Sequence, residues 1–259
     1  MDFGLRGKNA FVTGGSHGIG RAIAIALADE GVNVAICSRN QARIDETLGE
    51  LKKRGVKAFG VVVDVLNSGD IERGFAAVMK EFQTLHILVN NVGGGGSWGS
   101  EDPEETKDEV WLQVFEKNAL AAARFTTRAL PYMRKEEWGR VVTITSKFGR
   151  EGGGRPWFAM AKSAQMGMMK TFALDPRYAR LGITFNCVAP GNIMIPETGW
   201  EVMKMENPAE FAAIVESSPQ GRLGTPEEVA HLVVFLCSNQ ASHITGASIP
   251  IDGGESKSF

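Results

Sequence analysis

Residues 13–20 read Thr-Gly-Gly-Ser-His-Gly-Ile-Gly and lie between an apolar run, Lys8–Thr13, and a helix-like stretch, Ile19–Glu30. In a strand–turn–helix of this kind, closely spaced glycines let the backbone approach a diphosphate and let the helix pack tightly on the strand. The unpaired amides at the helix start and the helix dipole then favour the negative charge. The segment therefore predicts a dinucleotide-binding βαβ unit. The residues expected to contact the dinucleotide here are Gly14, Ser16, His17, Gly18, Ile19 and Gly20.

Short apolar runs alternate with longer helical stretches along the rest of the chain, which is typical of repeated βαβ units and a parallel sheet. The predicted strands are Lys8–Thr13, Asn33–Cys37, Lys57–Val63, His86–Asn90, Arg140–Thr145, Ile183–Val188 and Ala247–Ile251. The predicted helices are Ile19–Glu30, Gln41–Arg54, Ser68–Phe82, Trp157–Leu181 and Pro226–Cys237, and further helical material is predicted over Lys107–Met133. No Pro- or Ser-rich linker divides the chain. We predict one α/β domain over residues 1–259, a doubly wound parallel (Rossmann) sheet with helices on both faces, in three layers.

The end of the second predicted strand indicates which dinucleotide fits. It reads Cys37-Ser38-Arg39-Asn40, without the carboxylate that usually binds the ribose hydroxyls of NAD. The Arg39 guanidinium can instead bind a 2′-phosphate, and His17 offers a second cationic or donor group. The alternative is that Arg39 is an ordinary surface arginine. This strand end favours NADP(H) over NAD(H).

Composition argues against several other classes of protein. The net charge is −2 and the basic residues are scattered, so we expect neither nucleic acid nor a membrane as a partner. The polar N-terminus carries no apolar signal core, and no apolar run is long enough to span a bilayer, so we expect a cytoplasmic protein. Cys37, Cys187 and Cys237 have neither metal-ligand nor disulfide spacing, which predicts free buried thiols and no metal.

Further motifs follow in an order known from one family. They are the 13–20 segment, Asp64-Val65, Asn90-Asn91-Val92-Gly93, Asn118, Ser146, Pro190-Gly191 with Ile193, Gly246 and Asp252-Gly253-Gly254. Over nearly its whole length the chain resembles the short-chain dehydrogenase/reductase family, which implies oxidoreductase activity on a ketone or secondary alcohol. The resemblance implies further cofactor contacts at Asp64, Val65, Asn90, Asn91, Lys162, Pro190, Gly191 and Ile193. It implies catalytic roles for Asn118, Ser146, Lys162 and the residue at position 158.

The family signature Tyr-x-x-x-Lys falls at residues 158–162, where Phe158 replaces the tyrosine and Lys162 is retained. The spacing places both residues on one face of a helix. In the family chemistry the tyrosine protonates the alkoxide left by hydride transfer, its pKa lowered by the lysine. Ser146 would then bind the oxyanion, and Asn118 would hold a water leading to Lys162. Phe158 keeps the shape and removes a proton donor that contributes about 10²–10⁴-fold in rate.

Three explanations of Phe158 are compatible with the sequence. The tyrosine was replaced deliberately to trap a substrate, a natural lineage uses another acid, or the protein binds nucleotide and ligand without turnover. Candidate acids are Lys147 and a water relayed from Lys162 and Asn118, although a solvated surface residue is the interpretation of Lys147 that the sequence favours. We predict an NADP(H)-dependent oxidoreductase. The alternative is a catalytically impaired homologue that binds a nucleotide or ligand.

The irregular segment 192–221 predicts either a substrate lid or a helical excursion. Arginines at the substrate end of the site would bind a carboxylate or phosphate, and indoles would stack on a ring, although each also fits a packing role. The candidates are Trp98, Arg150, Arg155, Trp157 and Trp200. The resemblance also implies a homotetramer or homodimer formed through the helices predicted at 107–133 and 157–181. The substrate is expected to be a small carbonyl or alcohol.

Overall fold

Seven parallel strands form one sheet in the order β3-β2-β1-β4-β5-β6-β7. The computed structural model describes residues 2–258, so Met1 and Phe259 of the predicted domain lie outside it. The strands are β1 Asn9–Thr13, β2 Asn33–Ser38, β3 Ala58–Val62, β4 Ile87–Asn90, β5 Gly139–Ile144, β6 Ile183–Pro190 and β7 Ser248–Ile251. The chain crosses from β3 back past β1 to β4, so the two halves of the sheet grow outward from β1 and β4. Ligands bind at such a switch point, beyond the carboxyl ends of the strands.

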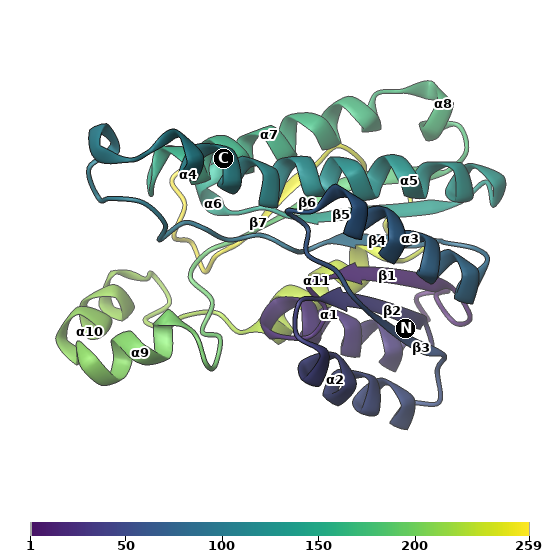
Figure 1. Ribbon diagram of the computed structural model, residues 1–259, viewed down its shortest axis with the longest axis horizontal. Helices are drawn as coiled ribbons and strands as arrows, with labels where there is room; N and C mark the ends of the chain where they lie inside the picture. Colours follow the sequence, from purple (N-terminus) through teal and green to yellow (C-terminus); the bar gives the residue numbers. More distant parts are fainter. Residues whose placement is uncertain (1, 259) are drawn as a thin grey trace.

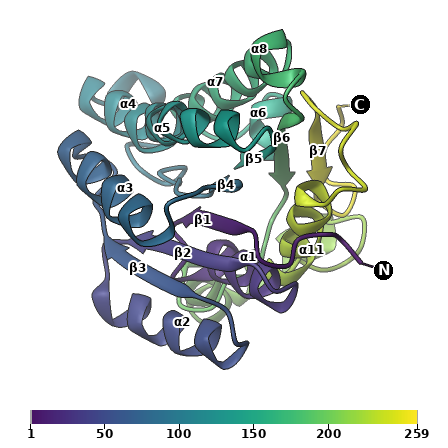
Figure 2. The same cartoon turned by 90° about the vertical axis from the view of Figure 1, so that its right-hand side faces the viewer.

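Helices cover both faces of this sheet. They are α1 Gly18–Asp29, α2 Gln41–Lys53, α3 Ser68–Phe82, α4 Asp108–Phe115, α5 Ala121–Lys135, α6 Lys147–Arg150, α7 Pro156–Ala173, α8 Pro176–Ala179, α9 Gly199–Glu206, α10 Pro208–Ser217 and α11 Pro226–Cys237. Two short turns are η1 Pro103–Glu105 and η2 Glu116–Leu120. Figure 2 shows α1, α2 and α11 on one face and α3, α5 and α7 on the other. The predicted doubly wound, three-layer fold is confirmed.

Alternation along the strands divides the core into two layers. In β1, Ala10 and Val12 pack with the α1 and α11 side, whereas Phe11 packs with the α3 and α5 side. Successive side chains of a strand point to opposite faces, so a strand covered on both sides must be apolar throughout. This is why the strands are recognisable in the sequence as continuous apolar runs.

The helical material predicted at 107–133 is confirmed as an unbroken helical run, in which η2, a π-helical turn that contains Asn118, joins α4 to α5. The helix predicted at 157–181, in contrast, is wrong as a continuous element. The stretch 157–181 ends as α7 at Ala173, and α8 then starts afresh at Pro176. Proline lacks the amide that would continue the helix and favours the first helical position, and the Asp175 side chain caps the new start. The short helix α6 was not predicted.

Residues 192–221 contain the two helices α9 and α10, which pack on each other and bury none of their own residues. Figure 1 shows this pair projecting from the body of the molecule. The segment is therefore a helical excursion, and its role as a lid stays a prediction.

The structure also describes the cysteines, the possible metal-binding groups and the hydrophobicity of the helices. All three cysteines are free and buried, as predicted, and burial raises the pKa of each thiol to about 12. Between residues 2 and 258 no group of three or more His, Cys, Asp or Glu side chains could hold a metal ion. No helix in that same range is both long and apolar enough to cross a bilayer.

Candidate active site

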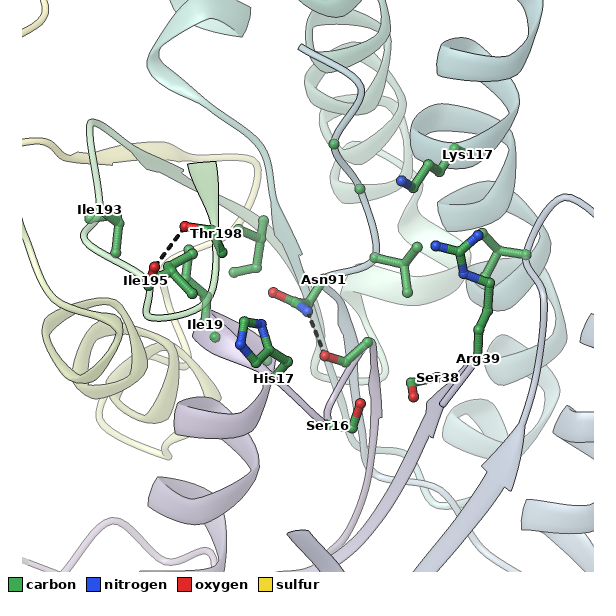
Figure 3. Close-up of a pocket in the computed structure, with 18 of the residues that line it drawn as sticks. Ser16, His17, Ile19, Ser38, Arg39, Asn91, Lys117, Ile193, Ile195 and Thr198 are labelled. Atoms are coloured by element: carbon green, nitrogen blue, oxygen red, sulfur yellow. Dashed lines mark hydrogen bonds between the residues drawn. The ribbon is translucent and has the colours of Figure 1, made fainter. Parts of the chain in front are cut away.

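A cavity of about 810 Å³ opens at the carboxyl ends of the central strands. It brings together segments that lie far apart in the sequence, from the glycine-rich segment to residues 195–200 at the start of α9 (Figure 3). The predicted site residues that line it are Gly14, Ser16, His17, Gly18, Ile19, Gly20, Arg39, Asp64, Val65, Asn91, Ser146, Phe158, Lys162, Pro190, Gly191 and Ile193. Two predicted residues, Asn90 and Asn118, lie outside this lining.

The glycine-rich segment forms a turn that no larger residue could make. A Cβ atom on Gly20 would collide with the Gly14 carbonyl oxygen, which is backbone and cannot move aside. His17 occupies the N-cap of α1 without a capping hydrogen bond from its side chain, so the first amides of the helix are not capped by this residue. Asn91 fixes the segment from the end of β4, because its Nδ2 donates to the Thr13 carbonyl oxygen over 2.9 Å. This arrangement suits an anionic diphosphate at the helix start.

Asn90 and Asn118 support the cavity wall from behind. The Asn90 amide, at the end of the central strand β4, is buried and donates to the hydroxyls of Thr126 in α5 and Thr143 in β5. Asn118 is fully buried, and its Nδ2 donates to the carbonyl oxygens of Gly94 and Val114. These contacts tie η2 to the loop after β4. The side chains of both residues are therefore directed into the protein framework.

Lys162 is the buried cation of the site. It lies one helical turn after Phe158 on α7, as the spacing predicted, and its Nζ is 5.6 Å from the centre of the Phe158 ring. Nζ donates to the Ile144 carbonyl oxygen over 3.0 Å. Burial lowers the pKa of Lys162 to about 7, with a smaller raising effect from Cys187 and a lowering effect from Lys117. An ammonium group with this pKa gains and loses its proton near neutral pH.

Ser146 and Lys147 follow β5 but face different surroundings. Ser146 lines the cavity, and its Oγ caps α6 by accepting from the Phe148 amide over 3.3 Å. Lys147 does not line the cavity. Its Nζ instead pairs with the Glu255 carboxylate at 2.5 Å, and both side chains are largely buried. Glu255 also accepts from the Asn192 amide. Lys147 is therefore not the solvated surface residue that the sequence allowed.

Three of the five candidates for substrate recognition are turned away from the cavity. Arg155 donates to the carbonyl oxygens of residues 98, 99 and 100, and Arg150 donates to the Ser248 carbonyl oxygen. Trp157 is fully buried. Both arginines thus contact backbone carbonyl oxygens, which favours the packing role that the sequence also allowed, and their recognition of a substrate carboxylate or phosphate stays a prediction.

The rest of the cavity lining includes aromatic, apolar and charged side chains. Trp98 and Trp200 line the cavity, as the sequence suggested, together with Ile195 and Thr198 from the stem of α9. Lys117 and Arg43 also line the cavity, and neither was predicted. A signal for Lys117 was available, since it directly precedes Asn118 in the motif, whereas Arg43 is one of many charged residues on an amphipathic helix.

Known proteins share this sequence and architecture. A family profile described as enoyl-(acyl carrier protein) reductase matches residues 14–256. The 3-oxoacyl-(acyl-carrier-protein) reductase FabG of Aquifex aeolicus is 35% identical over 266 residues, covering 98% of this chain and 99% of the relative. The chain belongs to the short-chain dehydrogenase/reductase family.

Other members of this family are similar to the same extent. Human dehydrogenase/reductase SDR family member 4 is 34% identical over 252 residues, covering 96% of this chain and 88% of the relative. The structure of L-sorbose reductase from Gluconobacter frateurii, complexed with NADPH and L-sorbose, has a TM-score of 0.90 at 32% identity and covers 100% of both chains. That of a single-residue variant of actinorhodin polyketide ketoreductase with NADPH has a TM-score of 0.89 at 32% identity, covering 97% of this chain and 98% of the other. The chain is thus similar to reductases of this family along almost its full length.

Proposed function

We propose that this protein is an NADP(H)-dependent reductase of ketones, or dehydrogenase of secondary alcohols, that works without the tyrosine of the family signature. The observation that carries the proposal is the placement of Ser146, Phe158 and Lys162 around one cavity, with Lys162 buried beside the Phe158 ring. A buried lysine aimed at a cavity is costly to maintain, which argues for a chemical use.

The residues present fit the proposed cofactor. A Cβ atom on Gly20 would meet the Gly14 carbonyl oxygen, so glycine here keeps the turn tight enough for a diphosphate to approach its backbone, and Arg39 lines the cavity at the end of β2, where a 2′-phosphate would be recognised. Relatives in this family are known in complex with NADPH. When bound, NADP(H) exchanges a hydride with the substrate carbon. Gly14–Gly20, Arg39, Asp64-Val65, Pro190-Gly191 and Ile193 would hold it.

Three side chains of the site have separate roles in the reaction. The Ser146 hydroxyl donates a hydrogen bond to the substrate oxygen and stabilises the negative charge that develops on it. Phe158 supplies an apolar wall and no proton. The Lys162 ammonium is the group with a suitable pKa, and it delivers the proton through solvent in the cavity. Lys147 is excluded from this role by its pairing with Glu255.

A second candidate function rests on Phe158 itself. Without a tyrosine hydroxyl, the site fits a catalytically impaired homologue that binds a nucleotide or a carbonyl ligand without significant turnover. The two candidates differ in one respect that can be measured, namely whether the unaltered chain oxidises NADPH in the presence of a ketone.

The test compares NADPH oxidation by the unaltered chain and by Phe158→Tyr over a panel of ketones. The proposal expects slow but measurable turnover by the unaltered chain, and a rate about two to four orders of magnitude higher with the tyrosine. Phe158→Leu serves as the control, because it also lacks a hydroxyl. Equal rates for the unaltered chain and Phe158→Tyr would refute the assumed role of position 158. Turnover by Phe158→Tyr alone would favour the binding candidate.

We further propose self-association through α4, η2 and α7, as a homotetramer or homodimer. Large apolar side chains are exposed on these elements, and α4 packs against α7. They are Leu112, Phe115, Leu120 and Met160. Exposed apolar side chains of this kind commonly lie in an interface between subunits. Light scattering coupled to size exclusion tests this, and a monomer at micromolar concentration would contradict it.

A further inference from the structure

Lys117 lines the cavity from the segment that joins α4 to α5. It lies in the π-helical turn η2, beside the buried Asn118 whose amide ties the turn to Gly94. Its Nζ lies 4.4 Å above the centre of the Trp98 ring, and a Cβ atom on Gly94 would be 3.7 Å from it. Figure 3 shows the Lys117 side chain directed toward the same space as the Arg39 guanidinium, from the opposite wall.

The cationic side chains that line this cavity differ in the ion pairs and hydrogen bonds that they form. Arg43 pairs with Glu197 at 2.7 Å, and Lys162 donates to a carbonyl oxygen. Arg39 and Lys117, in contrast, form no ion pair with any residue between 2 and 258. Two unpaired cations therefore face one part of the cavity.

The surroundings of Lys117 also favour an anion at this position. Burial lowers its pKa, and the Arg39 guanidinium lowers it further, against a smaller raising effect of Asp64. The Asp64 carboxylate is also engaged locally, since its Oδ1 accepts from the Leu66 amide. Holding two like charges near each other in a partly buried place is unfavourable unless an anion neutralises them. A phosphate with about two negative charges would neutralise both cations.

We propose that Lys117 and Arg39 together form the binding site for the 2′-phosphate of NADP(H). The inference rests on the proposed cofactor and adds a specificity-determining residue on the helical segment after β4. Arg39 stands at the end of β2, where the adenosine ribose is recognised in this fold. Lys117 supplies the second cation from across the cavity. Its contact with the Trp98 face keeps the ammonium in place while no phosphate is bound.

The test is calorimetric titration of NADP⁺ and NAD⁺ into the unaltered chain, Lys117→Met and Lys117→Arg. A hydrogen bond between two charged groups is worth about 1.5–3 kcal/mol, so Lys117→Met is expected to weaken NADP⁺ binding by about 10- to 100-fold. NAD⁺ binding is expected to change less than about twofold, since it lacks the phosphate. Lys117→Arg keeps the charge and is expected to restore most of the NADP⁺ affinity. The control is Lys135→Met, which removes the same charge from the exposed end of α5.

The outcomes separate this inference from the proposed function. If the unaltered chain binds NAD⁺ as tightly as NADP⁺, the proposed cofactor preference itself fails. If it prefers NADP⁺ and Lys117→Met retains that preference, only the role of Lys117 fails, and Arg39 acts alone. An equal loss of both nucleotides in Lys117→Met overturns the assignment to the 2′-phosphate. Unfolding curves of each variant confirm that the titrated protein is folded, and Lys117→Gln replaces any variant that is not.

Discussion

The two ends of the cavity are built from different parts of the polypeptide. The end formed by Gly14–Gly20 is defined by backbone, because a Cβ atom on Gly20 has no space against the Gly14 carbonyl oxygen. The end formed by Ser146, Phe158 and Lys162 is defined by side chains on an otherwise ordinary strand end and helix. A single substitution can therefore change the chemistry of the second end and leave the fold intact, whereas a substitution in the first end disturbs the shape of the site.

Removing the Lys162 ammonium is expected to have the largest effect. Lys162→Met leaves the chain without a proton donor beside the substrate oxygen, so the rate of ketone reduction is expected to fall by about 10²–10⁴-fold. Folding should be retained, because methionine fills the buried space without the cost of burying a charge. Single-turnover NADPH oxidation measures the rate, and Lys170→Met, exposed on the same helix, is the control. A loss of less than about threefold would show that another group is the acid.

At the backbone-built end, the expected effect is on binding. Gly20→Ala forces a methyl group against the Gly14 carbonyl oxygen, and overpacking of this kind costs about 1–3 kcal/mol. We expect NADP⁺ affinity to fall by about tenfold or more, with a lower midpoint of unfolding. Titration and denaturant unfolding measure the two quantities. The control is Gly49→Ala in α2, where a Cβ meets no atom within 4 Å. Equal behaviour of the two variants would remove the distinction between the two ends of the cavity.

The smallest effect on catalysis is expected for Lys147→Met. The Lys147 ammonium is held by Glu255 outside the cavity, so the rate of reduction should stay within about threefold of that of the unaltered chain. Stability should nevertheless fall by about 3 kcal/mol, because the buried Glu255 carboxylate loses its partner. Thermal unfolding and single-turnover rates check both parts. A fall in rate as large as that of Lys162→Met would make Lys147 the acid.

The sequence could predict those features that depend on local pattern. The strands are visible as apolar runs, and the Gly14–Gly20 turn as a glycine spacing that backbone geometry requires. The four-residue spacing of Phe158 and Lys162 is enough to place both on one face of α7.

Features set by contacts between distant segments could not be predicted in this way. The π-helical turn around Asn118 is held by hydrogen bonds to Gly94, 24 residues away in the chain. Arg155 was expected to meet a substrate, yet its guanidinium is held by the carbonyl oxygens of residues 98–100. The break between α7 and α8 is the exception, since Pro176 is a local signal for the start of a new helix.

The central claim is that Lys162 supplies the proton that Phe158 cannot. The most direct measurement is the single-turnover rate of NADPH oxidation with a ketone, followed from about pH 6 to about pH 9. Burial lowers the pKa of Lys162 to about 7, and only its ammonium form can donate. The rate is expected to be constant below this pKa and to fall above it, with a limiting slope of about tenfold per pH unit. A rate independent of pH across this range would contradict the account.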